Sequence, residues 1–258
     1  MKLRLPYAAA ALACVFALAG CGKKEEEATK APASQPAATP IDPATAGIVS
    51  GSVKLDGAPP KAARLKTDAD AYCQKMHASA PLVSDEVVTG EGGSLANVIV
   101  YVKTGLENRT FETPKDAVVL DQNGCQYKPH VVALMANQSI DITNSDDTTH
   151  NIHPTPKNNR DWNKSQSPKA AKITDAFARE EVAIPVKCNV HSWMKSYIAV
   201  FKHPYFQVTT TKGSFELKNL PPGDYTIEAW HEKYGVTEQK VTVGPKETKK
   251  IDFVFKAS

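Results

Sequence analysis

The sequence lacks the features that would mark a nucleic-acid-binding or highly charged chain. Charged residues make up 23% of its 258 residues, aromatic residues 7%, and the formal net charge is only +3. Without Lys2 and Arg4, which lie in a predicted leader, the formal net charge falls to about +1. A net charge this small does not indicate nucleic-acid binding. The length allows one or two domains of ordinary size once the ends are trimmed.

No apolar run is long enough to cross a membrane comfortably. The main candidate, Ala8–Ala19, follows a short basic start and is typical of an export signal, so residues 1–20 are predicted to be a signal peptide. The signal ends in Leu-Ala-Gly-Cys21, which resembles the bacterial lipoprotein box. The resemblance implies cleavage before Cys21 and lipid on that residue, which would anchor the protein at the bacterial cell envelope, facing the periplasm or on the cell surface. The alternative is an ordinary cleaved signal with an incidental cysteine.

Residues 21–47 contain little that a folded core would bury. A short charged run is followed by alanine, proline, serine, threonine and glutamine. This composition predicts a disordered tether whose use is to extend the reach of the folded part.

The rest of the chain is rich in short, alternating apolar segments, which predict β-strands and an all-β fold. The clearest of these segments are Ala96–Val102, Tyr127–Met135, Ser139–Thr143, Val182–Val186 and Tyr197–Phe201. Either of two domains could contain Ala96–Val102, so the boundary between domains stays open there.

The loop between the last two of these strands carries three soft donors: Cys188, His191 and Met194. A thiolate, an imidazole and a weak thioether suit copper, and a second histidine would complete a blue electron-transfer site. His150 lies on an earlier segment and can supply that imidazole. Taken one at a time, these residues are equally typical of a buried free cysteine, a hydrogen-bonded histidine and a core methionine.

The pattern Cys-x2-His-x2-Met after a strand, with His150-Asn151 upstream, resembles the cupredoxins, and the short loop is most similar to the amicyanin-like members. The resemblance covers about residues 118–201. It implies one type 1 copper ion per chain, with His150, Cys188 and His191 as equatorial ligands and Met194 as the axial ligand. Asn151 would brace the ligand loop by hydrogen bonds. The loop lacks the prolines that amicyanin-like loops carry around the second histidine.

A second resemblance lies at the C-terminus. Gly213-x-Phe-x-Leu followed by Leu220-Pro-Pro-Gly-x-Tyr is similar to carboxypeptidase-regulatory, transthyretin-like β-sandwiches, and residues 51–57 resemble their first strand. The predicted fold is therefore a cupredoxin Greek-key β-sandwich inserted in, or fused to, a second small β-sandwich. The cupredoxin domain is expected at residues 117–208, and the second sandwich at residues 48–116 plus 209–258.

The five cysteines divide between these assignments. Cys14 leaves with the leader, Cys21 carries lipid and Cys188 is a free thiolate, so Cys73 and Cys125 are predicted to form a disulfide. An alternative is that Cys73 and His77, four residues apart, bind metal or serve as a haem-like ligand. The haem attachment motif Cys-x-x-Cys-His is missing.

These observations predict a membrane-tethered electron carrier rather than an enzyme. Its partner would be a redox protein, either a cytochrome or a copper enzyme. The alternatives are a copper storage or delivery module, the blue-copper subunit of a multicopper oxidoreductase, and an interaction domain with a vestigial site. His191 is expected to be the ligand nearest solvent and the route by which electrons leave. His153, which precedes Pro154, is expected to face solvent or to hydrogen-bond near the site rather than to bind the metal.

Overall fold

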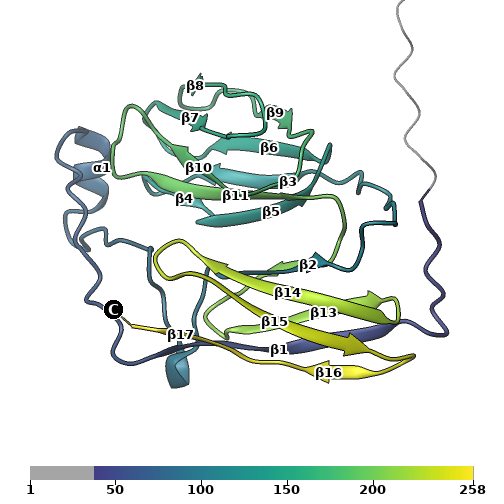
Figure 1. Ribbon diagram of the computed structural model, residues 1–258. Helices are drawn as coiled ribbons and strands as arrows, with labels where there is room; N and C mark the ends of the chain where they lie inside the picture. Colours follow the sequence, from purple (N-terminus) through teal and green to yellow (C-terminus); the bar gives the residue numbers. More distant parts are fainter. Residues whose placement is uncertain (1–37, 258) are drawn as a thin grey trace, which may run out of the picture. The chain divides into compact units, whose positions relative to one another are not determined.

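The computed structural model describes residues 38–257, and this part of the chain is all-β (Figure 1). Its helical structure is limited to α1 (Ala71–Met76) and the single 3-10 turn η1 (Glu91–Gly93). The predicted all-β fold class is therefore confirmed. The predicted leader, the lipidation site Cys21 and residues 21–37 of the tether lie outside the described residues. No helix within residues 38–257 is long and apolar enough to cross a membrane.

The first sandwich is built from the two ends of the described chain. One of its sheets contains β13 (Ser214–Leu220), β1 (Gly47–Asp56), β16 (Thr248–Lys250) and β17 (Phe253–Lys256). The other contains β12 (Phe206–Val208), β2 (Ile99–Thr104), β14 (Gly223–His231) and β15 (Gly235–Val243). Because β1 pairs with β13, β16 and β17, the early strand and the C-terminal strands form one sheet.

Alternation of apolar and polar residues explains how this sandwich closes. In β13, Phe215 and Leu217 are buried while their neighbours are exposed, because successive strand residues point to opposite faces. The inward residues pack with Val49 and Val53 of β1 in one apolar core. Burying a side chain of this size contributes roughly 1.5–3 kcal/mol.

The second sandwich lies in the sequence between β2 and β12. Its larger sheet has the order β5 (Val131–Met135), β11 (Lys195–Phe201), β10 (Glu181–Lys187), β7 (His150–Pro154), β8 (Lys164–Gln166). Its smaller sheet has the order β4 (Tyr127–Lys128), β3 (Val118–Gln122), β6 (Ser139–Asn144), β9 (Ile173–Ala176). Side chains of both sheets share a separate apolar core.

Strand β2 is buried on both faces, which explains why its sequence fits either domain. Val100 and Val102 belong to the core of the first sandwich. Ile99 and Tyr101 pack with Phe201 of β11 in a third apolar cluster that joins the two sandwiches. Figure 1 shows the sheet of β2 and β14 next to the sheet of β5 and β11.

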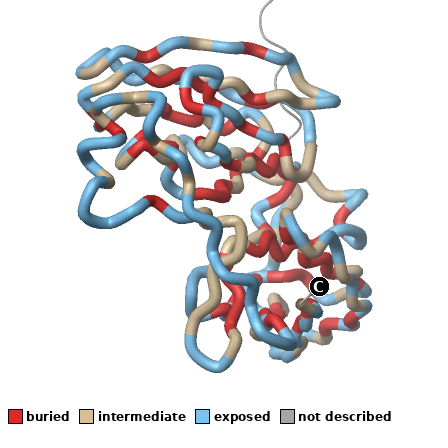
Figure 2. The backbone as a smooth tube through the Cα atoms, turned by 90° about the vertical axis from the view of Figure 1, so that its left-hand side faces the viewer, coloured by how far each residue is buried: buried red, intermediate tan, exposed pale blue. Residues whose placement is uncertain are grey.

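The structure corrects one predicted boundary. Residues 206–208 were expected at the end of the cupredoxin domain, but they form β12, which pairs with β2 of the first sandwich. The hydrogen-bonding partners of this short strand decide its membership, and a composition change along the sequence does not reveal them. Figure 2 shows how buried and exposed residues follow one another along the described chain.

Candidate metal centre

The loop from Cys188 to Met194 is a tight connection between β10 and β11. Lys187 and Lys195 pair across the strand ends, and the Cys188 N–H donates to the Met194 carbonyl at 3.3 Å. The Met194 N–H donates to the His191 carbonyl at 3.0 Å. These bonds fold the loop so that the three predicted ligands on it are buried, while the residues between Cys188 and His191 are exposed.

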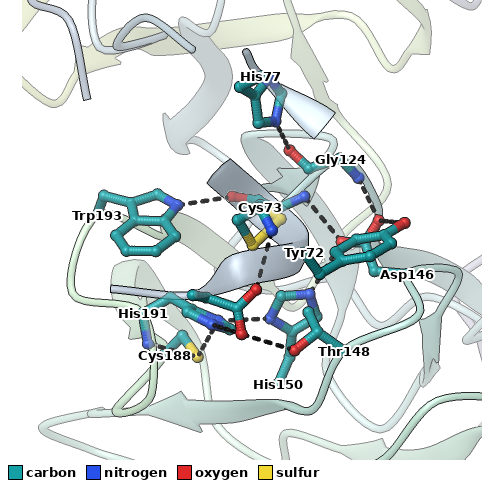
Figure 3. The surroundings of a disulfide bond; sticks show 12 residues. Tyr72, Cys73, His77, Gly124, Asp146, Thr148, His150, Cys188, His191 and Trp193 are labelled. Carbon is teal, nitrogen blue, oxygen red and sulfur yellow. Dashed lines mark hydrogen bonds and ion pairs between the residues drawn. A yellow bond between two sulfur atoms is a disulfide. The ribbon is translucent and has the colours of Figure 1, made fainter. Parts of the chain in front are cut away.

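His150, at the start of β7, completes the cluster. Its Nδ1 lies 2.8 Å from Nδ1 of His191, which in turn lies 3.9 Å from Sγ of Cys188. The ligand atoms of these three residues lie within 4.8 Å of one another, and Figure 3 shows the two imidazoles and the thiol facing each other. Met194 is buried in the same apolar cluster as Cys188. The structure thus brings together side chains from positions that are about forty residues apart in the sequence.

Asn151 connects the histidine strand to the ligand loop. Its backbone N–H points to Sγ of Cys188 at 3.5 Å, and its side-chain oxygen accepts the N–H of Asn189 at 2.6 Å. The amide group of Asn151 also donates to Asn163 at 2.6 Å. These are the loop contacts expected of a residue that braces the site.

A buried carboxylate controls the charge of His150. Burial alone lowers the pKa of this imidazole, but the hydrogen bond between its Nε2 and Asp146, at 2.9 Å, outweighs burial and raises the pKa to about 9. Burial raises the pKa of the Cys188 thiol, yet the hydrogen bonds it receives hold that pKa below the ordinary value. Burial and the charge of His150 lower the pKa of His191.

The expectation that His191 is the ligand nearest solvent is wrong. Its exposed fraction is 1%, because α1 and the residues before it lie over the site. Asp70, the N-cap of α1, places Oδ2 3.4 Å from Nε2 of His191. That nitrogen is buried and has no hydrogen-bond partner within the described chain, so the contact is electrostatic rather than an aligned hydrogen bond.

His153 lies beside the cluster and not in it. Its ring nitrogens contact Asn189 at 3.2 Å and Asp161 at 3.1 Å. Its position three residues after His150 on β7 turns it to the other face of the strand. This is the arrangement that the sequence predicted for a histidine near the site.

The structure joins Cys73 to Cys125 by a disulfide, and Cys188 is the one free thiol within residues 38–257. The alternative role of Cys73 and His77 as metal or haem ligands finds no support, because the disulfide occupies Cys73. Nε2 of His77 lies 3.0 Å from the carbonyl oxygen of Gly124. The disulfide therefore links α1 to the turn beside the candidate site.

Two carboxylates of the site were missed by the sequence analysis. Asp146 precedes His150 by four residues, and its position in a polar loop hid its contact with the imidazole. Asp70, the N-cap of α1, lies far earlier in the sequence than both histidines, and nothing in the sequence analysis marked it. An acid four residues before a candidate ligand is the signal that would have found the first.

The donor set fits copper. One sulfur and two imidazole nitrogens are soft or intermediate donors, and both imidazoles have a carboxylate at the ring nitrogen that faces away from the cluster. The backbone N–H groups that point to the thiol oppose its protonation. These residues are therefore suited to hold a metal ion of this kind.

Comparisons with known proteins found one family model and several solved structures that resemble parts of this chain. Residues 202–252 match the family described as BOS complex subunit NOMO1-like, second beta sandwich domain. This segment covers β12 to β16 of the first sandwich, where the sequence motif had predicted a β-sandwich of the transthyretin-like type. A search of curated proteins found no match.

Solved structures similar to this chain include several copper proteins. The copper-containing nitrite reductase of Thermus scotoductus SA-01 is 14% identical with a TM-score of 0.32, over 39% of this chain and 25% of the reductase. Amicyanin from Paracoccus versutus is 16% identical with a TM-score of 0.30, over 39% of this chain and 96% of amicyanin.

A purple cupredoxin from Nitrosopumilus maritimus is 20% identical with a TM-score of 0.28, over 33% of this chain and 99% of the cupredoxin. This chain thus spans about a quarter of the reductase and nearly the whole of the small cupredoxins. These scores and identities are low, so the three structures carry no argument about what this chain does.

Proposed function

We propose that this chain is an exported type 1 copper protein that carries single electrons between redox partners. The observation that carries the proposal is the buried convergence of Cys188, His191 and His150. This is the equatorial donor set of blue copper sites, and Met194, buried in the same cluster, is the candidate axial ligand. A copper ion bound there would supply one-electron chemistry by changing between its two oxidation states.

The scaffold around these residues suits electron transfer. Two of the donors lie on a loop closed by paired strands, and the third lies on β7, which pairs with β10. Asn151 and Asp146 hold the loop and His150 from outside the cluster. A fixed donor set limits rearrangement when the charge of the metal changes, and the donors have almost no exposed surface for a substrate to contact.

The test is a visible spectrum of the purified protein titrated with Cu(II). We expect an intense blue colour from charge transfer between the Cys188 thiolate and copper, saturating at one copper per chain. Cys188→Ser should lose the colour and keep the fold, which circular dichroism can check. Tight copper binding without colour in the unaltered protein would contradict the type 1 assignment.

A copper storage or delivery module would use the same ligands, so a kinetic measurement is needed to distinguish it from an electron carrier. An electron carrier should exchange electrons reversibly with a periplasmic cytochrome while retaining its copper. Transfer of the copper itself to a chelating partner, faster than any electron exchange, would favour delivery. More than one copper per chain would favour a multicopper oxidoreductase.

The membrane attachment is a separate proposal that rests on the sequence. The signal-like residues 1–20 are followed by Cys21, and acylation of that cysteine would anchor the protein at the cell envelope. Cys21→Ala should release the protein from membranes or stall its processing. If the variant were processed normally and stayed membrane-bound at the level of the unaltered protein, the lipid anchor would be excluded.

A further inference from the structure

The feature that the proposed function leaves unexplained is the carboxylate of Asp70. It comes from a segment that the sequence assigns to the other sandwich, and its Oδ2 lies 3.4 Å from the outer nitrogen of His191. The carboxylate is fixed in place by two further bonds. Oδ1 accepts the N–H of Cys73 at 2.9 Å, and Oδ2 accepts the hydroxyl of Thr148 at 2.9 Å.

The same segment is connected to the carboxylate on the other imidazole. The disulfide joins Cys73, in α1, to Cys125. The N–H groups of Gly124 and Cys125 donate to the two oxygens of Asp146, at 2.7 and 2.8 Å. Asp146 in turn binds His150, so one covalently closed unit holds a carboxylate against each of the two histidines (Figure 3).

The side chain of Trp193 adds a further connection between this unit and the ligand loop. Its indole N–H donates to the carbonyl of Cys125 at 3.0 Å, and its ring lies 4.9 Å from the ring of His191. Together with α1, this contact keeps His191 at 1% exposure. His191 is almost fully buried and the side chain of Asp70 is 20% exposed, so solvent screens the charge of this carboxylate only in part.

We propose that Asp70 is a positioning residue of the copper site, which fixes the His191 imidazole and lowers the reduction potential through its negative charge. The inference rests on the proposed function and deepens it. A fixed negative charge beside a ligand favours the more positive, oxidised state of the bound metal. A fixed charge at the outer nitrogen of a metal-binding histidine also favours the ring orientation that keeps this nitrogen close to it.

The experiment compares Asp70→Asn with Asp68→Asn in the full chain, exported and purified with detergent. Both variants remove one negative charge from the same segment, but Asp68 is exposed. Asparagine is as good an N-cap as aspartate, so the start of α1 is retained. Reduction potentials are measured by spectroelectrochemical titration of the blue absorption.

We expect Asp70→Asn to raise the ratio of reduced to oxidised copper at a fixed potential about tenfold, equivalent to about 59 mV for a one-electron couple. Asp68→Asn should change this ratio much less, because solvent and salt screen an exposed charge. Equal shifts in the two variants would overturn the role of Asp70.

A second variant, Asp70→Ser, protects the test against a local folding defect, since serine also caps a helix and carries no charge. It should raise the potential in the same direction. Failure of both Asp70 variants to fold would overturn the proposal by showing that Asp70 is a structural residue. A colourless unaltered protein would instead refute the proposed function, so the two failures are distinguishable.

Discussion

The two sandwiches each bury histidines, and the contrast between His231 and His150 shows what separates structure from site. Both side chains are completely buried. Burial lowers the pKa of His231, in the first sandwich, to about 4, so this imidazole stays neutral. Burial acts on His150 in the same direction, but Asp146 reverses the effect and raises the pKa to about 9. A buried carboxylate, and not the depth of burial, therefore accounts for the difference between these two histidines.

The largest expected effect comes from removing the histidine that the carboxylate holds. His150→Ala should abolish the blue absorption of the copper-loaded protein, or allow it to return only when free imidazole fills the gap. His153→Ala is the matched control, because it lies on the same strand and outside the donor cluster. It should keep the colour, with at most a modest change in potential. The reverse result in these variants would assign the ligand role to His153.

The next largest effect is expected from removing the Cys73–Cys125 disulfide, which lies beside the candidate site in the second sandwich. Replacing Cys73 and Cys125 together by alanine removes a crosslink between two residues that are 52 positions apart in the sequence. We expect the free energy of unfolding to fall by about 4 kcal/mol, because the unfolded chain gains conformational entropy when the crosslink is removed. Urea denaturation measures the change. An unchanged midpoint would show that the disulfide does not stabilise the folded state.

Stability should respond to pH in opposite directions for two buried histidines. Burial lowers the pKa of His130, but Asp85 and Glu232 outweigh it and raise this pKa to about 9. A raised folded pKa gives stability that is full below the unfolded value of about 6.5 and is lost as pH rises toward 9. His231, with its lowered pKa of about 4, is stabilising above 6.5, and this contribution is lost as pH falls toward 4.

Each of these contributions is on the order of 3 kcal/mol. Urea midpoints measured across the pH range test them. His130→Gln should flatten the alkaline side of the profile, and His231→Phe should flatten the acid side. If either substitution left its own side of the profile unchanged, the corresponding pKa shift would be wrong.

The smallest effect is expected from a matched pair of tyrosines. Tyr225, in the first sandwich, donates to the carbonyl of Pro221, and Tyr127, in the second, donates to the carbonyl of Asn151. Replacement of either by phenylalanine should cost about 1–2 kcal/mol, because a buried acceptor loses its partner. Only Tyr127→Phe should also shift the blue absorption band, since Asn151 contacts the ligand loop. A shift caused by Tyr225→Phe would contradict the separation of the two regions.

The sequence predicted those parts of the site that depend on local spacing. Cys188, His191 and Met194 lie on one short loop between two apolar strands, and the alternation of those strands predicted the β-fold. The carboxylates escaped prediction, because Asp70 reaches His191 only through the fold of a distant segment. For the same reason the prediction that His191 lies nearest solvent was wrong, because residues distant in sequence cover it.

The sequence analysis did not place the boundary between the domains correctly, for a related reason. The sequence analysis placed residues 206–208 in the cupredoxin domain, and only their pairing with β2 assigns them to the first sandwich. The burial of both faces of β2 also depends on a contact between the two sandwiches, which no pattern within one strand records. Local periodicity thus predicts strands but not their partners.

Cys188, His150 and His191 are proposed to form a type 1 copper site. Electron paramagnetic resonance of the Cu(II)-loaded protein can detect such a site, because the parallel copper hyperfine splitting reports how far the unpaired electron is shared with sulfur. We expect a narrow splitting that becomes wide in Cys188→Ser. A wide splitting in the unaltered protein, identical to that of Cys188→Ser, would contradict this proposal.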